Sequence, residues 1–197
     1  MGERILYLVR HGQYHQNHTH QDDLGGGLTE MGSEQAWMAA QALASLPIKH
    51  IYTSPLRRAI ETADIIAGVF PGIIPEREDT LHEVVPTIPS QEAEFFARHF
   101  PELTADRVII ERRDAEKAFD RFFVPASGDD VHEVLICHGN IIRYFACRVL
   151  GVPIDAWTNM ETNHCGLTCC TIAPQGRMLL TSLNDIGHLP HNLRTFM

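Results

Sequence analysis

Two histidines stand at the ends of short apolar runs that lie far apart in the sequence. His11 follows the run 5–9 with Arg10 between them, and His138 follows the run 134–137. Neutral imidazole can attack phosphorus without first losing a proton. Arginine offers a planar set of donors that matches the oxygens of a phosphate group. These residue types predict phosphoryl chemistry, provided that the fold brings the two histidines together.

A glycine follows each histidine and permits the backbone to approach a ligand closely. The residues after His138 are expected to begin a helix, so the amides of Gly139 and Asn140 are candidate donors to a bound anion. A protonated His138 would add positive charge at the same place. The alternative for His138 is a hydrogen-bonded histidine of the core. An Arg-His pair taken by itself is also compatible with a surface turn.

The elements around these residues predict the fold class. The apolar runs before the histidines are typical of strands buried on both faces, and segments of helical periodicity follow them. Thr29 and Ser54 are candidate helix caps. The segments 167–173 and 177–183 flank a Pro-Gln-Gly turn and predict a hairpin. We therefore expect a three-layer α/β/α fold with a mostly parallel central sheet and an antiparallel edge, in which ligands bind at the carboxyl ends of the strands.

The domain organisation follows from length and from one helical segment. A chain of 197 residues is long enough for one large core, and we see no linker or repeat that would divide it. We expect a single domain over 1–197. Residues 86–128 have helical spacing and a more polar character, which predicts a helical, lid-like insertion over the edge of the sheet.

The composition argues against several classes of partner. The chain carries 16 Lys and Arg against 25 Asp and Glu, a formal net charge of −9, so we expect no nucleic-acid partner. Since no stretch reaches the roughly 20 apolar residues of a membrane helix, we expect no membrane partner. The five cysteines form no recognisable disulfide framework and favour a reducing cytoplasm. The oligomeric state stays open, a homodimer included.

A group of histidines near the N-terminus suggests a metal site at first sight. It consists of His11, His15, His18 and His20, but the polar residues between them indicate an irregular loop rather than a helix that would align ligands. The glycines at 25–27 lack the Lys and Ser or Thr of a nucleotide-binding P-loop, so they favour a flexible flap. We therefore expect neither a metal nor a cofactor.

Several short motifs share an order and spacing that is more specific than any one of them. They are Arg10-His11-Gly12, Ser54-Pro55-Leu56-Arg57-Arg58-Ala59 with Thr62-Ala63, and His138-Gly139-Asn140, supported by Leu28-Thr29, Gly32 and Gln35-Ala36. In this arrangement the chain resembles the histidine phosphatase superfamily, also called phosphoglycerate mutase-like, over nearly its whole length. The resemblance implies a three-layer α/β fold, a phosphohistidine intermediate and no required metal.

The resemblance also implies roles for single residues. His11 would carry the phosphoryl group. The residues that would bind the phosphate are Arg10, Asn17, Arg58 and His138. Residue type alone allows either Arg57 or Arg58 to face the site, and the Arg-Ala-x-x-Thr-Ala spacing of the family selects Arg58.

The leaving group of a phosphate ester needs a proton donor. The family places a glutamate after a strand in the middle of the chain, and Leu-His-Glu at 81–83 fits that position, so the resemblance assigns the general acid to Glu83. The same carboxylate would activate water in the second half-reaction, with its pKa raised where water is excluded. Glu76, Glu78 and Asp79 are rival candidates.

Further motifs are similar to one branch of the family, which contains a mitochondrial serine/threonine-protein phosphatase. They are Arg-His-x-Gln-Tyr-His at 10–15, Arg-Ala-Ile-Glu-Thr at 58–62, Ile-Cys-His-x-Asn-x-Ile-Arg-Tyr at 136–144 and Asn-Asp-x-Gly at 184–187. Gln13 stands where mutases and many small-molecule phosphatases carry glutamate, which favours hydrolysis. Because we see no membrane-anchor segment in this chain, the resemblance does not carry the mitochondrial location over.

We therefore expect a metal-independent phosphomonoester hydrolase of the histidine acid phosphatase type. Its substrate would be a phosphoserine or phosphothreonine protein or a small phosphate ester. One alternative is a phosphoglycerate mutase, which must protect its phosphoenzyme from water. The other is a phosphate-recognition module that binds but does not turn over.

Overall fold

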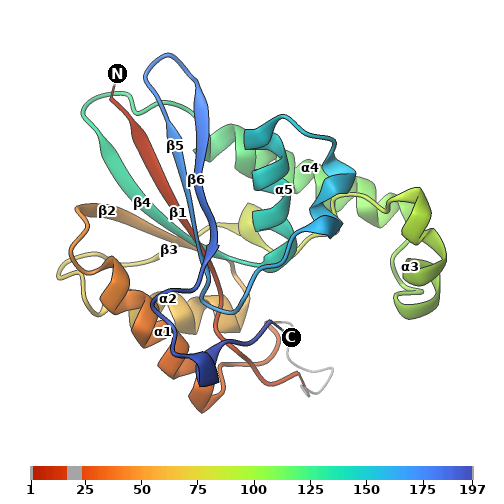
Figure 1. Ribbon diagram of the computed structural model, residues 1–197, viewed down its shortest axis with the longest axis horizontal. Coiled ribbons are helices and arrows are strands. Elements are labelled where there is room, and N and C mark those ends of the chain that lie inside the picture. The colour runs from red at the N-terminus through yellow and green to blue at the C-terminus, as the bar shows by residue number, and fades with distance from the viewer. Residues whose placement is uncertain (1, 17–23, 197) are drawn as a thin grey trace.

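The computed structural model describes residues 2–16 and 24–196, and within these ranges the named strands form one six-stranded sheet (Figure 1). The strands are β1 (Arg4–Arg10), β2 (Ile48–Thr53), β3 (Glu76–Arg77), β4 (Val131–Cys137), β5 (Leu167–Ile172) and β6 (Met178–Asp185). Their order is β3-β2-β4-β1-β5-β6. Pairing is parallel from β3 to β1 and antiparallel at β5 and β6. The predicted, mostly parallel sheet with an antiparallel edge is confirmed.

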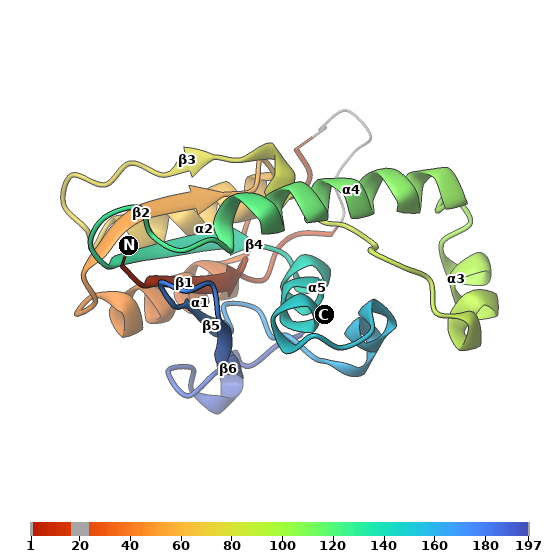
Figure 2. The same ribbon diagram turned by 90° about the horizontal axis from the view of Figure 1, so that it is seen from above.

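Helices cover both faces of this sheet, so the predicted three layers are present (Figure 1). The α-helices of the described residues are α1 (Glu30–Leu43), α2 (Arg57–Ala67), α3 (Ala93–His99), α4 (Ala105–Phe122) and α5 (Gly139–Leu150), of which α3 lies apart from the sheet (Figure 2). Leu8 and Leu135 pack with α4 and α5 on one face of the sheet. Val9 and Ile136 pack with α1 and α2 on the other. Because successive side chains of a strand point to opposite faces, both cores draw on the same apolar runs.

The sheet places the two histidines of interest next to each other. β1 and β4 are adjacent parallel strands, and Arg10 lies opposite Cys137 in their register. The residues that follow these two positions are His11 and His138, which therefore leave the sheet side by side at its carboxyl edge. A sequence separation of more than a hundred residues is thus closed by a single strand pairing.

The structure confirms one predicted helix cap and corrects the other. At the start of α1, the Thr29 hydroxyl accepts a hydrogen bond of 3.0 Å from the Gly32 amide. Ser54 does not cap α2, which begins only at Arg57. The Ser54 hydroxyl lies instead 2.7 Å from Nε2 of His138. Ser54, which was predicted to cap a helix, therefore forms a hydrogen bond with a histidine of the candidate site.

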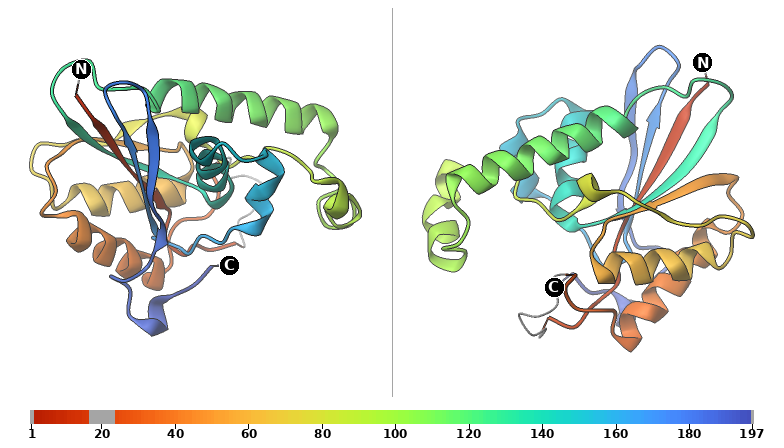
Figure 3. Two further views of the ribbon diagram at one scale, coloured as in Figure 1. Left: turned by 45° about the horizontal axis from the view of Figure 1, so that its top comes forward. Right: turned by 180° about the vertical axis from the view of Figure 1, so that it is seen from behind.

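The helical segment 86–128 divides into two parts. α3 stands away from the sheet, beyond the far end of α4 (Figure 2; Figure 3). In the other direction α4 reaches the main core, to which it contributes Ala115, Ala118, Phe119 and Phe122. The role of a lid, and the assignment of the whole chain to one domain, stay predictions.

Gly32 lies where the loop after β1 passes close to α1. A Cβ at this position would lie 1.9 Å from the carbonyl oxygen of Gln13, which is backbone and cannot rotate away. We expect Gly32→Ala to lower the free energy of unfolding by roughly 1–3 kcal/mol or more, as measured by urea denaturation. Gly128→Ala is the matched control, because a Cβ there meets nothing within 4 Å. Equal losses in both variants would contradict this packing argument.

Candidate active site

The guanidinium group of Arg58 joins the two predicted histidines. Its Nε donates to Nε2 of His11 at 3.0 Å, and its Nη2 donates to Nδ1 of His138 at 3.1 Å. The two imidazole rings have centroids 5.1 Å apart and are tilted by 58°. The predicted convergence of His11 and His138 is therefore present, with a cation between them.

The hydrogen bonds of His11 determine which ring nitrogen carries its proton. Nδ1 lies 2.8 Å from the carbonyl oxygen of Gly12, which can only accept, so Nδ1 is the donor. Nε2 is left with its lone pair, which accepts from Arg58. His11 is fully buried, and burial lowers its pKa well below 6.5, assisted by the positive charges of Arg58 and Arg10. His11 is thus neutral, as a nucleophile must be.

His138 is also neutral in this arrangement. Because a guanidinium group can only donate, Nδ1 of His138 must accept from Arg58, and the ring proton is on Nε2, which donates to Ser54. Burial lowers the pKa of His138 well below its ordinary value, with Arg58, His82 and Arg10 adding to the shift. The positive charge expected from a protonated His138 is therefore supplied by Arg58.

Arg58 is held in the first turn of α2 and is 9% exposed. Its guanidinium carbon lies 4.6 Å from the centre of the Tyr14 ring, in a cation–π contact. The neighbouring Arg57 is exposed. The structure thus places in the site the arginine that the family spacing selects.

Arg10 is fixed through one of its terminal nitrogens. Nη1 donates to the carbonyl oxygens of Thr162, at 2.6 Å, and Phe196, at 2.7 Å. Its Nε is buried and has no hydrogen-bond partner within the described residues. The chain passes close to Gly139 here, because a Cβ on Gly139 would lie only 2.9 Å from Oγ1 of Thr162, the residue whose carbonyl oxygen holds Arg10. Arg10 is therefore held in place through Nη1, while its buried Nε keeps a donor for which the described residues offer no acceptor.

The side chain of Glu83 contacts the first turn of α5. Its Oε1 accepts from the amides of Asn140, at 3.2 Å, and Val84, at 3.3 Å. The Asn140 amide, predicted as a donor to the anion, is thus used by Glu83. Burial raises the pKa of the Glu83 carboxyl group, although nearby Arg58 and Arg10 oppose the shift. A raised pKa suits a residue that must give and take a proton.

The rival carboxylates lie elsewhere. Glu78 is buried in an ion pair with Arg121 and accepts from Thr80, whereas Glu76 and Asp79 are exposed. Of these four carboxylates, the structure brings only Glu83 close to Arg10 and Arg58.

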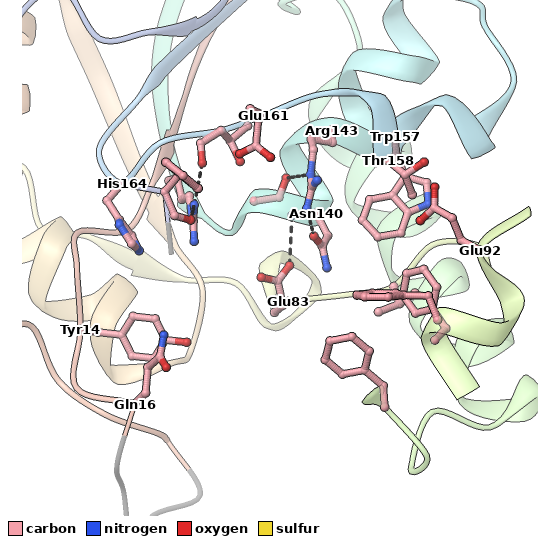
Figure 4. Close-up of a pocket in the computed structure, with 18 residues that line it drawn as sticks. Tyr14, Gln16, Glu83, Glu92, Asn140, Arg143, Trp157, Thr158, Glu161 and His164 are labelled. Carbon is pink, nitrogen blue, oxygen red and sulfur yellow. Dashed lines mark hydrogen bonds between the residues drawn. The ribbon is translucent and has the colours of Figure 1, made fainter. Parts of the chain in front are cut away.

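A cavity of about 650 Å³ opens beside these groups (Figure 4). Arg10, Glu83 and Gly139 belong to its wall. Two further wall residues, Tyr14 and His164, have rings 5.1 Å and 5.6 Å from the ring of the buried His11. Four aromatic side chains also line the cavity, Phe95, Phe96, Phe100 and Trp157, and Figure 4 shows Trp157 across the cavity from Tyr14. The cavity therefore combines a cationic end near His11 with an apolar end formed mainly around α3.

Sequence reasoning did not single out two polar wall residues, Arg143 and His164. Arg143 follows Asn140 by one turn of α5, and its place in the motif at 136–144 was a signal that could have revealed it. His164 had no such signal, because its partner Thr195 lies 31 residues further on. Of the predicted phosphate ligands, Asn17 lies outside the described residues.

The histidine-rich loop is only partly described. His15 is exposed, and His18 and His20 lie outside the described residues. Within residues 2–16 and 24–196, no group of three or more His, Cys, Asp or Glu side chains is arranged to hold a metal ion. Among the helices in the same ranges, none is both long enough and apolar enough to span a membrane.

Proteins of known name resemble this chain over most of its length. The mitochondrial serine/threonine-protein phosphatase Pgam5 of Caenorhabditis briggsae is 34% identical over 98% of this chain and 67% of its own length. Its counterpart in Homo sapiens is 35% identical over 95% of this chain and 64% of its own length. The chain thus spans about two thirds of the length of these relatives. Their names support the predicted phosphomonoesterase function.

The expected cytoplasmic location is contradicted by these relatives, which are named as mitochondrial proteins. The expectation relied on the cysteines. All five lie in the described part of the chain as free thiols. Four of them are buried, where cysteine packs like any small apolar residue. The absence of a disulfide framework therefore does not identify the cellular compartment.

The fold and the family are shown by two further findings. The solved structure of YhfR from Bacillus stearothermophilus matches with a TM-score of 0.73 at 21% identity, covering 95% of this chain and 100% of the other, which establishes the fold. The sequence model of the histidine phosphatase superfamily (branch 1) matches residues 6–185. The predicted resemblance is therefore confirmed, and the chain belongs to the histidine phosphatase superfamily.

Proposed function

We propose that this protein hydrolyses phosphomonoesters through a phosphohistidine at His11, with Glu83 as the proton carrier. The observation that supports this most is the Arg58 bridge, which holds two neutral imidazoles in one cationic site. Arg10 adds a buried Nε that has no partner within the described chain, and Glu83 adds a carboxyl group of raised pKa. These are the three requirements of phosphoryl transfer: a nucleophile, charge stabilisation and an acid.

In the first half-reaction, the phosphate ester displaces an internal hydrogen bond. Arg58 donates to the lone pair with which His11 would attack. A phosphate offers Arg58 its non-bridging oxygens instead, and this exchange frees Nε2 of His11. Nε2 then bonds to phosphorus as the ester P–O bond breaks. The leaving oxygen takes its proton from Glu83, which becomes a carboxylate.

In the second half-reaction, water replaces the alcohol. The Glu83 carboxylate takes a proton from a water molecule, whose oxygen bonds to phosphorus as the P–N bond to His11 breaks. Inorganic phosphate leaves, and both His11 and Glu83 return to their starting protonation states. Arg10 and Arg58 stabilise the charge on the equatorial oxygens in both steps.

We propose a phosphorylated serine or threonine side chain of a protein as the substrate, with a small phosphate ester as the alternative. The cavity continues beyond the cationic end to an aromatic wall, where Phe95 is 52% exposed and Phe100 is 44% exposed. This space suits a leaving group larger than an alcohol of a few carbons. The names of the curated relatives support the same substrate class. Comparing kcat/KM for phosphoserine peptides and for small phosphate esters tests it; equal values for free phosphoserine and its peptides would contradict it.

The mutase alternative is disfavoured by Gln13. Its Oε1 accepts from the Thr29 hydroxyl at 2.9 Å, so this side chain supports the start of α1. An uncharged amide at this place also lacks the carboxylate that mutases carry there. Phosphoglycerate should therefore be hydrolysed or left unchanged, and its isomerisation would support the mutase. Tight phosphate binding without turnover would support a recognition module.

The pKa shift of His11 predicts the pH dependence of activity. Protonated His11 cannot attack, and burial together with the charges of Arg58 and Arg10 lowers its pKa below 6.5. The acid limb of kcat/KM is therefore expected below pH 6.5. In Arg58→Gln the positive neighbour is absent, so this limb should move to higher pH. Both proteins are measured with one aryl phosphate, so that the ionisation of the substrate is common to both. An unchanged limb would contradict the role of Arg58 in holding His11 neutral.

A further inference from the structure

A third imidazole, that of His164, borders the cavity. The residue lies just before β5 and is 1% exposed. Its ring lies 5.6 Å from that of His11 and 6.5 Å from that of Tyr14. Figure 4 shows His164 on the same side of the cavity as Tyr14. The reaction described above gives this side chain no part.

The outer nitrogen of this ring, Nε2, has no hydrogen-bond partner among the described residues. Three buried side-chain nitrogens lack a hydrogen bond within the described residues, and two of them, Nε of Arg10 and Nε2 of His164, belong to residues of the cavity wall. A buried polar group without a partner is unfavourable, because it has given up its hydrogen bonds to water and gained none in return. Two such nitrogens on one wall indicate a ligand that brings its own acceptor oxygens.

We propose that His164 binds the substrate, by donating a hydrogen bond from Nε2–H to a non-bridging oxygen of the transferring phosphoryl group. The proposal rests on the proposed function, because it assumes that the phosphoryl group is held next to His11. His164 would then be a neutral hydrogen-bond donor to the phosphoryl group, beside the charged donors of Arg10 and Arg58.

The contact with Thr195 allows His164 to carry its ring proton on the outer nitrogen. Nδ1 lies 2.8 Å from Oγ1 of Thr195, and that oxygen accepts a bond of 2.8 Å from the side-chain amide of Gln35. The Thr195 hydroxyl keeps a proton of its own to give, so with an anion oxygen at Nε2 the ring proton lies on Nε2 and Nδ1 accepts from Thr195. Burial, and to a lesser extent the positive charge of Arg10, lowers the pKa of His164 to about 3. His164 is therefore a neutral donor throughout the range in which His11 is a neutral nucleophile.

A purely structural role would not need the outer nitrogen. The backbone amide of His164 donates to the Thr195 carbonyl, and Nδ1 bonds to the Thr195 hydroxyl. These two bonds already tie the C-terminal segment to the loop before β5. Asparagine could make both of them, because its amide group reaches as far as Nδ1. The two roles therefore make different demands on the side chain: only substrate binding requires a hydrogen-bond donor at the position of Nε2.

Two substitutions test this separation. His164→Asn keeps a polar group at the position of Nδ1 and removes the donor at Nε2, whereas His164→Gln extends an amide donor towards the position of Nε2. We expect His164→Asn to weaken inhibition by inorganic phosphate and orthovanadate, and to lower kcat/KM for an aryl phosphate, by roughly 10–100-fold. His164→Gln should recover most of both losses.

His188→Asn is the matched control. His188 is half-buried in the same C-terminal region, and its Nε2 bonds to the Cys165 carbonyl oxygen at 3.1 Å, away from the wall of the cavity. The inhibition constants of His188→Asn for inorganic phosphate and orthovanadate should equal those of the unaltered protein. The thermal midpoints of all three variants are recorded alongside, to separate loss of fold from loss of anion binding.

Two outcomes would overturn the proposal. One is an unchanged affinity of His164→Asn for phosphate and vanadate. The other is a loss of affinity that His164→Gln fails to recover and that accompanies a lower thermal midpoint, which would assign His164 to structure alone. Because calorimetric binding of phosphate needs no turnover, it tests His164 even if the protein forms no phosphohistidine. The proposed function and the role of His164 can therefore fail separately.

Discussion

Replacing His11 with asparagine is expected to abolish hydrolysis, with kcat/KM for an aryl phosphate falling by at least roughly 10⁴-fold, as for other nucleophile deletions. The side-chain amide of asparagine can still donate to the Gly12 carbonyl, as Nδ1 does at 2.8 Å. It has no lone pair that could bond to phosphorus at the place of Nε2. The variant should therefore keep the fold and its affinity for phosphate while losing the chemical step.

The measurement is steady-state kinetics together with acid-labile phosphate on the quenched protein. His50→Asn is the matched control, because His50 is an exposed residue of β2. The control should retain both turnover and label. Turnover in His11→Asn within tenfold of the unaltered protein would sink the assignment of His11, since a positioning residue could be replaced in part but a nucleophile could not.

Replacing Glu83 with glutamine is expected to slow turnover by roughly 10²–10⁴-fold and to make the phosphoenzyme accumulate. Glutamine keeps the oxygen that accepts from the Asn140 and Val84 amides, so the local backbone is preserved. An aryl oxide leaves without needing a proton, so His11 can still be phosphorylated. Water, however, has no base to activate it, and the P–N bond persists.

A burst of phenol equal to the protein concentration, followed by a slow steady state, is the expected result for Glu83→Gln. With phosphoserine, whose leaving oxygen does need a proton, the same variant should show no burst. Glu76→Gln is the control, because Glu76 is an exposed carboxylate of β3. Similar rates for both leaving groups, with no accumulation of phosphoenzyme, would contradict the role of Glu83 in proton transfer.

The elements that carry the main site residues could be predicted because their signals are local. The apolar run before His11 marks a buried strand wherever it occurs, and Thr29 identifies the start of a helix through a bond to an amide three residues away. The convergence of His11 with His138 needed only the rule that parallel strands end at one edge. The choice of Arg58 over Arg57 depended on the spacing of the family.

Other features could not be predicted because they depend on contacts between distant segments. Nothing near Ser54 in the sequence indicates that its hydroxyl bonds to a histidine 84 residues later. His164 likewise depends on Thr195, and the position of Arg10 depends on a carbonyl oxygen 152 residues away. The neutral state of His138 follows from its bond to Arg58 rather than from its own neighbours in the chain. Such partners become visible only once the fold has brought them together.

The central claim is that His11 and His138 surround one tetrahedral anion, and a crystal structure with orthovanadate tests it most directly. The account predicts vanadium bonded to Nε2 of His11, with the Arg58 bond to that nitrogen replaced by bonds to vanadate oxygens and with Nε of Arg10 among the donors. Vanadate bound only among the aromatic residues of the cavity, with Arg58 still bonded to His11, would contradict it.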